Sequence, residues 1–321
     1  MAKTKTNKLN FLRWILWILL VQFILGNVCA AIYAYKFTHF FKDPYEWNVA
    51  RPKNLLDKTW KLFKGPEFGK NENEPAPEFP YEHLILTTSN KTKIDSWYSS
   101  VPNAKGTICI FHGLTSNKAY YLPEANEFRN YGFNVFMLDF RGHGRSEGMK
   151  TSIGYNEAEE VKLAYDYVRK RSGDTVYLYG GSMGAVTIAR AVAVYKLNPT
   201  GIILDMPFDG LLDHIRARGR SFGFPQNLFA IPVSCWIALE NSFPVFQFKT
   251  SSYAKEIRCP VLLEWGTHDH LVTEKETQNI FNSLASKNKK LVVYEDGVHS
   301  SFFAQYPIKW KKEMEAFLNL H

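Results

Sequence analysis

A long uncharged apolar run near the start of the chain is the clearest feature of the hydrophobic pattern. It covers residues 14–35, and as a helix these 22 residues extend about 33 Å, enough to cross a hydrocarbon core of about 30 Å. The run therefore predicts a transmembrane helix. The alternative is a cleavable signal peptide with a small-residue cleavage site at 28–30, but apolar residues continue from 31 to 35, which favours retention.

The next segment, residues 36–80, is mixed in character and is interpreted as a linker. Its last ten residues, 71–80, are polar and rich in proline, which is typical of an extended connection. Within the segment 36–80, apolar residues recur at helical spacing over 54–64 and predict one short amphipathic helix.

From residue 81 to residue 321, short apolar runs alternate with segments of helical length, which predicts a single α/β domain. The runs are rich in β-branched and aromatic residues, and strands joined by helices form a mostly parallel sheet with helices on both faces. The first two strands have no helix between them, so we expect an antiparallel hairpin at one edge. The predicted strands are 83–89, 93–98, 107–111, 133–139, 175–179, 201–205, 260–265 and 290–295, and the predicted helices are 155–171, 183–195, 274–286 and 307–320.

A segment of about 49 residues, 209–257, separates two of the predicted strands and has room for two or three short helices. Aromatic residues concentrate on it or beside it, which is consistent with a lid over an apolar pocket as well as with ordinary packing. For its cluster of basic residues we expect solvated surface, the alternative being contact with anionic headgroups. The aromatic residues are Phe208, Phe222, Phe224, Phe229, Trp236, Phe243, Phe246 and Phe248, and the basic ones are His214, Arg216, Arg218 and Arg220.

Charge changes the picture only at the amino terminus. The formal net charge is +8, of which residues 1–42 supply +6 without a single acidic residue, so the remainder carries +2 and a basic nucleic-acid-binding face is not supported. Four basic residues in the segment 1–13 precede the apolar run and two follow it. This bias predicts a single-pass protein with a cytoplasmic amino terminus and the domain outside the cytoplasm.

Cysteine spacing excludes two further classes of site. The four cysteines are far apart and include no C-x-x-C pair, which argues against a structural zinc site and a disulfide framework. We expect no metal and no organic cofactor.

The candidate chemistry begins at a G-x-S-x-G sequence, with Gly180, Ser182 and Gly184 at its fixed positions. It follows a predicted apolar strand and opens a predicted helix. In that context a tight turn projects the serine hydroxyl above the sheet, and the glycines remove side chains where the backbones crowd.

With this motif the chain resembles the α/β-hydrolase superfamily over about residues 83–321, and in particular its serine aminopeptidase-like and monoacylglycerol-lipase-like branch. Four further segments match in the expected order: an H-G-x sequence at 112–114, a D-x-R-G-x-G-x-S-x-G sequence at 139–148, an acid-bearing loop at 266–269 and a histidine-bearing loop at 297–299. The resemblance implies an α/β-hydrolase fold, with 209–257 as a small helical cap. It also implies an oxyanion hole formed by the amides of Leu114 and Met183.

The resemblance and the chemistry agree on a catalytic triad. A serine hydroxyl needs a base at neutral pH, for which we predict His299, and the base needs an orienting acid, for which we predict Asp269. The chain order Ser182, Asp269, His299 is the order expected for this fold. Asp205, at the end of another predicted strand, is the alternative acid, and His112 is expected to shape the oxyanion loop.

These features predict a membrane-tethered serine hydrolase that acts on carboxylic esters or related acyl compounds through an acyl-enzyme. The substrate would be a small molecule or a lipid with an acyl group. Two alternatives stay open: a peptidase or acyltransferase on the same triad, since the pocket decides the acceptor, and a non-catalytic binding protein that keeps the fold. The sequence leaves the oligomeric state open.

Overall fold

The computed structural model describes residues 2–42, 54, 56, 57, 60, 64–72, 75–173, 175–221, 223 and 225–319. The amphipathic helix expected over 54–64 falls mostly outside these residues, as do Phe222 and Phe224.

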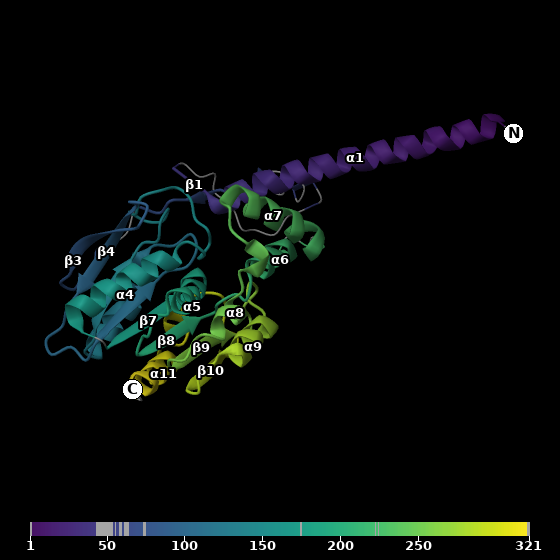
Figure 1. The fold of residues 1–321 in the computed structure, drawn as a ribbon. Helices are drawn as coiled ribbons and strands as arrows, with labels where there is room; N and C mark the ends of the chain where they lie inside the picture. The colour runs from purple at the N-terminus through teal and green to yellow at the C-terminus, as the bar shows by residue number, and fades with distance from the viewer. Residues whose placement is uncertain are drawn as a thin grey trace.

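A mostly parallel eight-stranded sheet forms the centre of the domain (Figure 1). Its order is β10-β9-β8-β7-β5-β6-β4-β3, and every neighbouring pair is parallel except β4 with β6 and β3 with β4. The expected edge hairpin is therefore confirmed as β3–β4. The strands are β3 (Glu82–Thr87), β4 (Lys93–Ser99), β5 (Thr107–Phe111), β6 (Asn134–Leu138), β7 (Val176–Gly181), β8 (Gly201–Asp205), β9 (Val261–Gly266) and β10 (Lys289–Tyr294).

Helices cover both faces because the buried strands are apolar on both sides. In β5, Ile108 and Ile110 join the core under one set of helices, whereas Cys109 and Phe111 join the core under the other, as the two-residue period of a strand requires. The first set is α3 (Leu122–Asn130) and α11 (Pro307–Asn319); the second includes α4 (Ala158–Ser172), α5 (Met183–Tyr195), α8 (Thr250–Ala254) and α9 (Glu274–Ser283). Short turns of helix, η1 (Lys118–Tyr121) and α10 (Phe302–Gln305), complete the domain.

The chain between β8 and β9 forms a small helical cap. It contains α6 (Leu211–Ser221), α7 (Gln226–Asn241), η2 (Val245–Gln247) and α8. Most of the aromatic residues described on this segment are structural: the Phe243 ring stacks on Tyr155 at 4.6 Å between centroids, and Phe208, Phe229 and Phe248 are buried.

The amino-terminal helix α1 (Ala2–Thr38) extends beyond the predicted run at both ends and projects from the body for most of its length (Figure 1). Within the described part of the chain, one helix is long and apolar enough to cross a membrane, judged by its length and composition. This candidate span is Asn10–Thr38 of α1. Its last turns are different, because Tyr33, Ala34 and Phe37 are buried in the core.

Those last turns pack on the cap. The rings of Tyr33 and Phe229 meet edge to face, 5.0 Å apart between centroids, and α7 lies along α1. Beyond the helix, the backbone N–H of Phe40 donates to the carbonyl of Met149 at 2.8 Å, and β1 (Phe40–Phe41) pairs with β2 (Phe68–Gly69). The last turns of the apolar helix and the residues directly after it are thus packed against the domain.

Candidate active site

Ser182 occupies the sharp turn between β7 and α5. Its φ of 52° and ψ of −115° lie in a region that residues with a side chain rarely adopt. The turn is possible because glycine flanks it: a Cβ on Gly184 would overlap the carbonyl of Phe111, and one on Gly181 would overlap the Tyr121 hydroxyl. The local sequence thus holds the serine hydroxyl at the carboxyl edge of the sheet.

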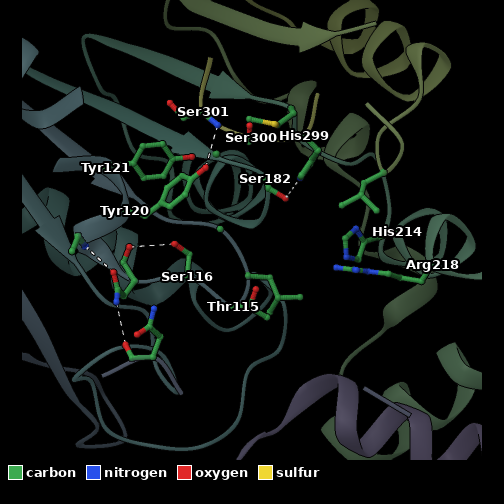
Figure 2. Close-up of a pocket in the computed structure, with 18 of the residues that line it drawn as sticks. Thr115, Ser116, Tyr120, Tyr121, Ser182, His214, Arg218, His299, Ser300 and Ser301 are labelled. Carbon is green, nitrogen blue, oxygen red and sulfur yellow. Dashed lines mark hydrogen bonds between the residues drawn. The ribbon is translucent and has the colours of Figure 1, made fainter. Parts of the chain in front are cut away.

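Three side chains from three strand ends form a hydrogen-bonded chain at this edge. Ser182 follows β7, Asp269 follows β9 and His299 follows β10. The His299 Nε2 lies 2.9 Å from Ser182 Oγ (Figure 2). The His299 Nδ1 lies 2.6 Å from Asp269 Oδ2. This pattern fits a neutral imidazole that donates from Nδ1 and accepts from the serine hydroxyl.

The Asp269 carboxylate is held on both of its oxygens. Its side chain is buried, and Oδ1 accepts the backbone N–H groups of Leu271 and Val272, each at 2.8 Å. These bonds leave Oδ2 directed at His299, so backbone N–H groups of the loop after β9 orient the carboxylate.

Asp205, the alternative acid, is engaged elsewhere. Its Oδ2 accepts the Tyr179 hydroxyl at 2.6 Å, and it faces Glu264 across the paired strands β8 and β9. Burial raises the pKa of Asp205 to about 6 and raises the pKa of Glu264 well above its ordinary value. Together the two carboxyls form a buried acid pair beneath the site.

The loop after β5 approaches the serine from the other side. A Cβ on Gly113 would lie 3.6 Å from the Cβ of Ser182, and Leu114 lines the same cavity. Met183 is the first residue of α5, where backbone N–H groups lack partners within the helix. The two residues expected to supply the oxyanion hole therefore lie on either side of Ser182.

His112 braces this loop. Its Nδ1 lies 2.7 Å from the carbonyl of Gly113, and its Nε2 accepts the backbone N–H of Phe140 at 3.0 Å. Burial lowers the pKa of His112 to about 4, so the ring is neutral at physiological pH. This arrangement supports the expectation that His112 shapes the loop.

The D-x-R-G segment is also structural. Asp139 accepts the buried ammonium of Lys118 at 2.7 Å, and Arg141 reaches Glu160 at 2.5 Å and Glu159 at 3.0 Å. These ion pairs fix the loop against η1 and α4, so Arg141 is occupied by carboxylates.

A cavity of about 540 Å³ opens over Ser182 and His299 (Figure 2). Its lining is rich in hydroxyl groups, from Thr115, Ser116 and Tyr120 among others, and includes none of the cap phenylalanines that the structure describes. Of the two alternatives for the cap aromatics, ordinary packing describes Phe208, Phe229, Phe243 and Phe248, because these rings are buried in the cap and core and do not line this cavity.

The cap contributes two basic residues to the cavity that the sequence analysis assigned to solvated surface. His214 and Arg218 of α6 line it on the side facing the serine (Figure 2). The four-residue spacing places both on one face of the helix, and that spacing is the signal that could have identified them. Tyr120 and Ser301, which belong to none of the sequence motifs, also line the cavity, from the segments after β5 and His299.

No group of three or more potential metal-ligating side chains occurs among the residues that the structure describes.

Comparisons with known proteins agree with this geometry. The family model described as serine aminopeptidase, S33, matches residues 102–215 and 247–305, more than half of the chain. The lysophosphatidylserine lipase ABHD12 of Danio rerio is 24% identical over 296 residues, which cover 88% of this chain and 74% of that protein. Protein bem46 of Schizosaccharomyces pombe is 25% identical over 240 residues, which cover 72% of this chain and 76% of that protein.

Among solved structures, the esterase Pf2001 of Pyrococcus furiosus superposes with a TM-score of 0.65 at 25% identity, covering 79% of this chain and 98% of that chain. A shared fold, a matching family model and relatives of the esterase and lipase type lead to one conclusion: the chain belongs to the serine aminopeptidase S33 family of the α/β-hydrolase superfamily.

Proposed function

We propose that this protein is a membrane-anchored serine hydrolase that cleaves carboxylic esters, with acyl lipids as its substrate class. The single observation that carries the proposal is the continuous chain Ser182–His299–Asp269, with its two hydrogen bonds of 2.9 Å and 2.6 Å, beside an open cavity. A serine that is bonded to a base, whose base is in turn oriented by an acid, is an arrangement that activates a nucleophile.

In the proposed mechanism, His299 takes the Ser182 proton as the serine oxygen attacks the ester carbonyl. The amides of Leu114 and Met183 stabilise the negative charge on the carbonyl oxygen. His299 then protonates the departing alcohol, which leaves an acyl group on Ser182. A water molecule, deprotonated by His299, attacks the acyl-enzyme; the carboxylic acid leaves and the serine is restored.

The cavity favours esters over the peptides that a serine aminopeptidase would take. An aminopeptidase substrate presents a protonated α-amine, which a carboxylate would recognise. Among the described residues that line the cavity there is no carboxylate, whereas Arg218 supplies a positive charge. The esterase and lipase relatives support the same choice.

The membrane part of the proposal rests on the exposed surface of α1. Apolar side chains such as Phe11, Trp14 and Phe23 are each more than two-thirds exposed, which is costly in water and favourable in lipid. We propose that α1 is retained as a single span, with its amino terminus in the cytoplasm and the hydrolase domain on the opposite side.

The direct test is replacement of the nucleophile. Ser182→Ala should abolish covalent labelling by a fluorophosphonate probe and lower ester turnover about 10³-fold or more, because the acyl-enzyme cannot form. Its melting temperature in detergent should show that the variant stays folded. Undiminished labelling of purified Ser182→Ala protein would contradict the proposal. An ester chain-length series, run beside aminoacyl amides, then distinguishes esterase from peptidase activity.

A further inference from the structure

Two basic side chains of the cap lie opposite the nucleophile, and neither forms an ion pair with any residue that the structure describes. His214 and Arg218 are one helical turn apart on α6, and both border the cavity that holds Ser182 (Figure 2). Neither takes part in the proposed ester chemistry, so their position in the cavity needs another explanation.

Both side chains have unused hydrogen-bonding groups. His214 is 2% exposed, yet neither of its ring nitrogens has a hydrogen-bond partner among the described residues, and the same is true of the buried Nε of Arg218. Arg216, on the same helix, is a contrast: it pairs with Asp213 at 2.7 Å and Asn227 at 2.9 Å. Burying polar and charged groups without partners is costly, and a ligand that satisfies them recovers that cost.

The charges and hydrogen-bonding groups of His214 and Arg218 favour an anion as their ligand. Burial and the neighbouring Arg218 and His299 lower the pKa of His214, so the imidazole is neutral and offers one N–H, while Arg218 supplies the charge. No carboxylate lines the cavity among the residues described. An arginine fork pairs well with the oxygens of a phosphate or a carboxylate.

His214 is held in place by apolar contacts behind it. Its ring lies 4.8 Å from Phe208 and 5.9 Å from Phe37 of α1, measured between centroids. These two rings offer His214 no hydrogen-bond acceptor, so its ring is positioned by packing and its nitrogens can meet a ligand in the cavity.

We propose that His214 and Arg218 form an anion subsite that binds the phosphate or carboxylate of the substrate, so that the protein acts on acyl esters with an anionic headgroup. This inference rests on the proposed ester hydrolysis at Ser182. It adds the class of headgroup, which the triad itself does not determine.

The kinetic test compares two esters that differ in one group, 1-decanoylglycerol 3-phosphate and 1-decanoylglycerol, with full-length protein in detergent. Wild type should show the higher kcat/KM for the phosphate ester. Arg218→Gln should lower the ratio of the two kcat/KM values about 10- to 100-fold, mainly through KM, because a charged hydrogen bond to the bound substrate is lost. Arg218→Lys should restore part of the ratio, and Arg216→Gln, the control on the same helix, should keep it.

A binding test separates the subsite from the catalytic step. Ser182→Ala protein should bind glycerol 3-phosphate and 1-decanoylglycerol 3-phosphate in calorimetry, and the double variant with Arg218→Gln should bind both more weakly. Binding that is lost with Arg218→Gln supports the subsite, whether or not wild type reacts with a fluorophosphonate. Failure of wild type to react would contradict only the hydrolase proposal. An unchanged ester ratio in a folded Arg218→Gln protein, or equal binding with and without Arg218, would overturn the subsite.

Discussion

Ser182 combines an unusual backbone with an ordinary hydrogen bond. Its positive φ is imposed by the turn between β7 and α5, and its hydroxyl meets His299 at 2.9 Å. Such strain persists only where the surrounding structure holds it, here the parallel pairing of β7 with β5 and β8. Ser182 is therefore positioned by the sheet, whereas His214 and Arg218, which we propose contact the substrate, are on the cap.

Replacing each candidate acid by asparagine distinguishes Asp269 from Asp205 as the acid of the triad. Asp269→Asn should lower ester kcat about 10³-fold, because an amide cannot stabilise the imidazolium that forms on His299. Asp205→Asn should cost less than about tenfold, since its carboxyl is bonded to Tyr179. Steady-state kinetics at matched melting temperature checks the order, and a reversed ranking would make Asp205 the acid.

The buried His112 predicts how stability responds to acid. Its folded-state pKa of about 4 lies below the ordinary 6.5, so between these values the unfolded chain binds more protons and the stability rises with pH. This contribution is complete above about pH 6.5 and lost as the pH falls toward 4, with a limit of about 3 kcal/mol.

Urea unfolding of His112→Asn, measured in steps from pH 4 to pH 7.5, should show a shallower rise of the unfolding free energy than wild type. His268→Asn serves as the control, because that histidine is exposed. A slope equal to that of wild type would mean that folding does not lower the pKa of His112.

At the residue scale, the sequence could identify what local motifs encode. Ser182, Asp269 and His299 each follow a strand in a recognisable loop, and the structure brings the three within hydrogen-bonding distance. Their catalytic roles stay predictions. His214 and Arg218 carry no such motif, because their placement depends on how the cap folds over the sheet, a long-range arrangement that periodicity cannot supply.

Among the elements, α1 joins two environments. Its apolar side chains from Phe11 to Leu25 are exposed, whereas Tyr33 and Phe37 enter the core beside Phe229 and His214. The same helix therefore supports the cap and, in the anchored form that we propose, crosses the membrane.

Removing one buried ring from α1 should test the supporting role. Phe37→Ala should lower the unfolding free energy by about 3 kcal/mol or more, because it leaves a cavity in a fully buried position. Leu25→Ala, at an exposed position on the same helix, is the control. Thermal unfolding in detergent micelles measures both, and equal melting temperatures for the two variants would contradict the role of α1 in the core.

The parallel direction of most strands could be predicted from their alternation with helices, and the β3–β4 hairpin from the missing helix between its strands. The extent of α1 could not. An apolar run ends at Tyr35 by composition, but the helix continues to Thr38, because tertiary packing of Phe37 and a hydrogen bond from the Thr38 hydroxyl to Ala34 stabilise the extra turn.

For the whole molecule, the charge bias around α1 predicts which side of the membrane the domain occupies. With the amino terminus in the cytoplasm, protease added to intact spheroplasts should degrade the hydrolase domain without lysis. A cytosolic protein probed in parallel should stay protected. Protection of the domain until lysis would reverse the orientation.

In the anchored form, the length of α1 determines the distance between the domain and the membrane. Its candidate span of 29 residues measures about 44 Å, which exceeds a hydrocarbon core by about 14 Å, and its final turns are the part buried in the body. A flexible tether of nine residues would let the domain move by some 15 Å, whereas here the end of the helix is itself packed in the body. In the anchored form, the mouth of the cavity stays at one distance from the lipid surface. The depth at which the ester group of a lipid lies in the leaflet would then decide whether it reaches Ser182, before any side chain of the cavity contacts it.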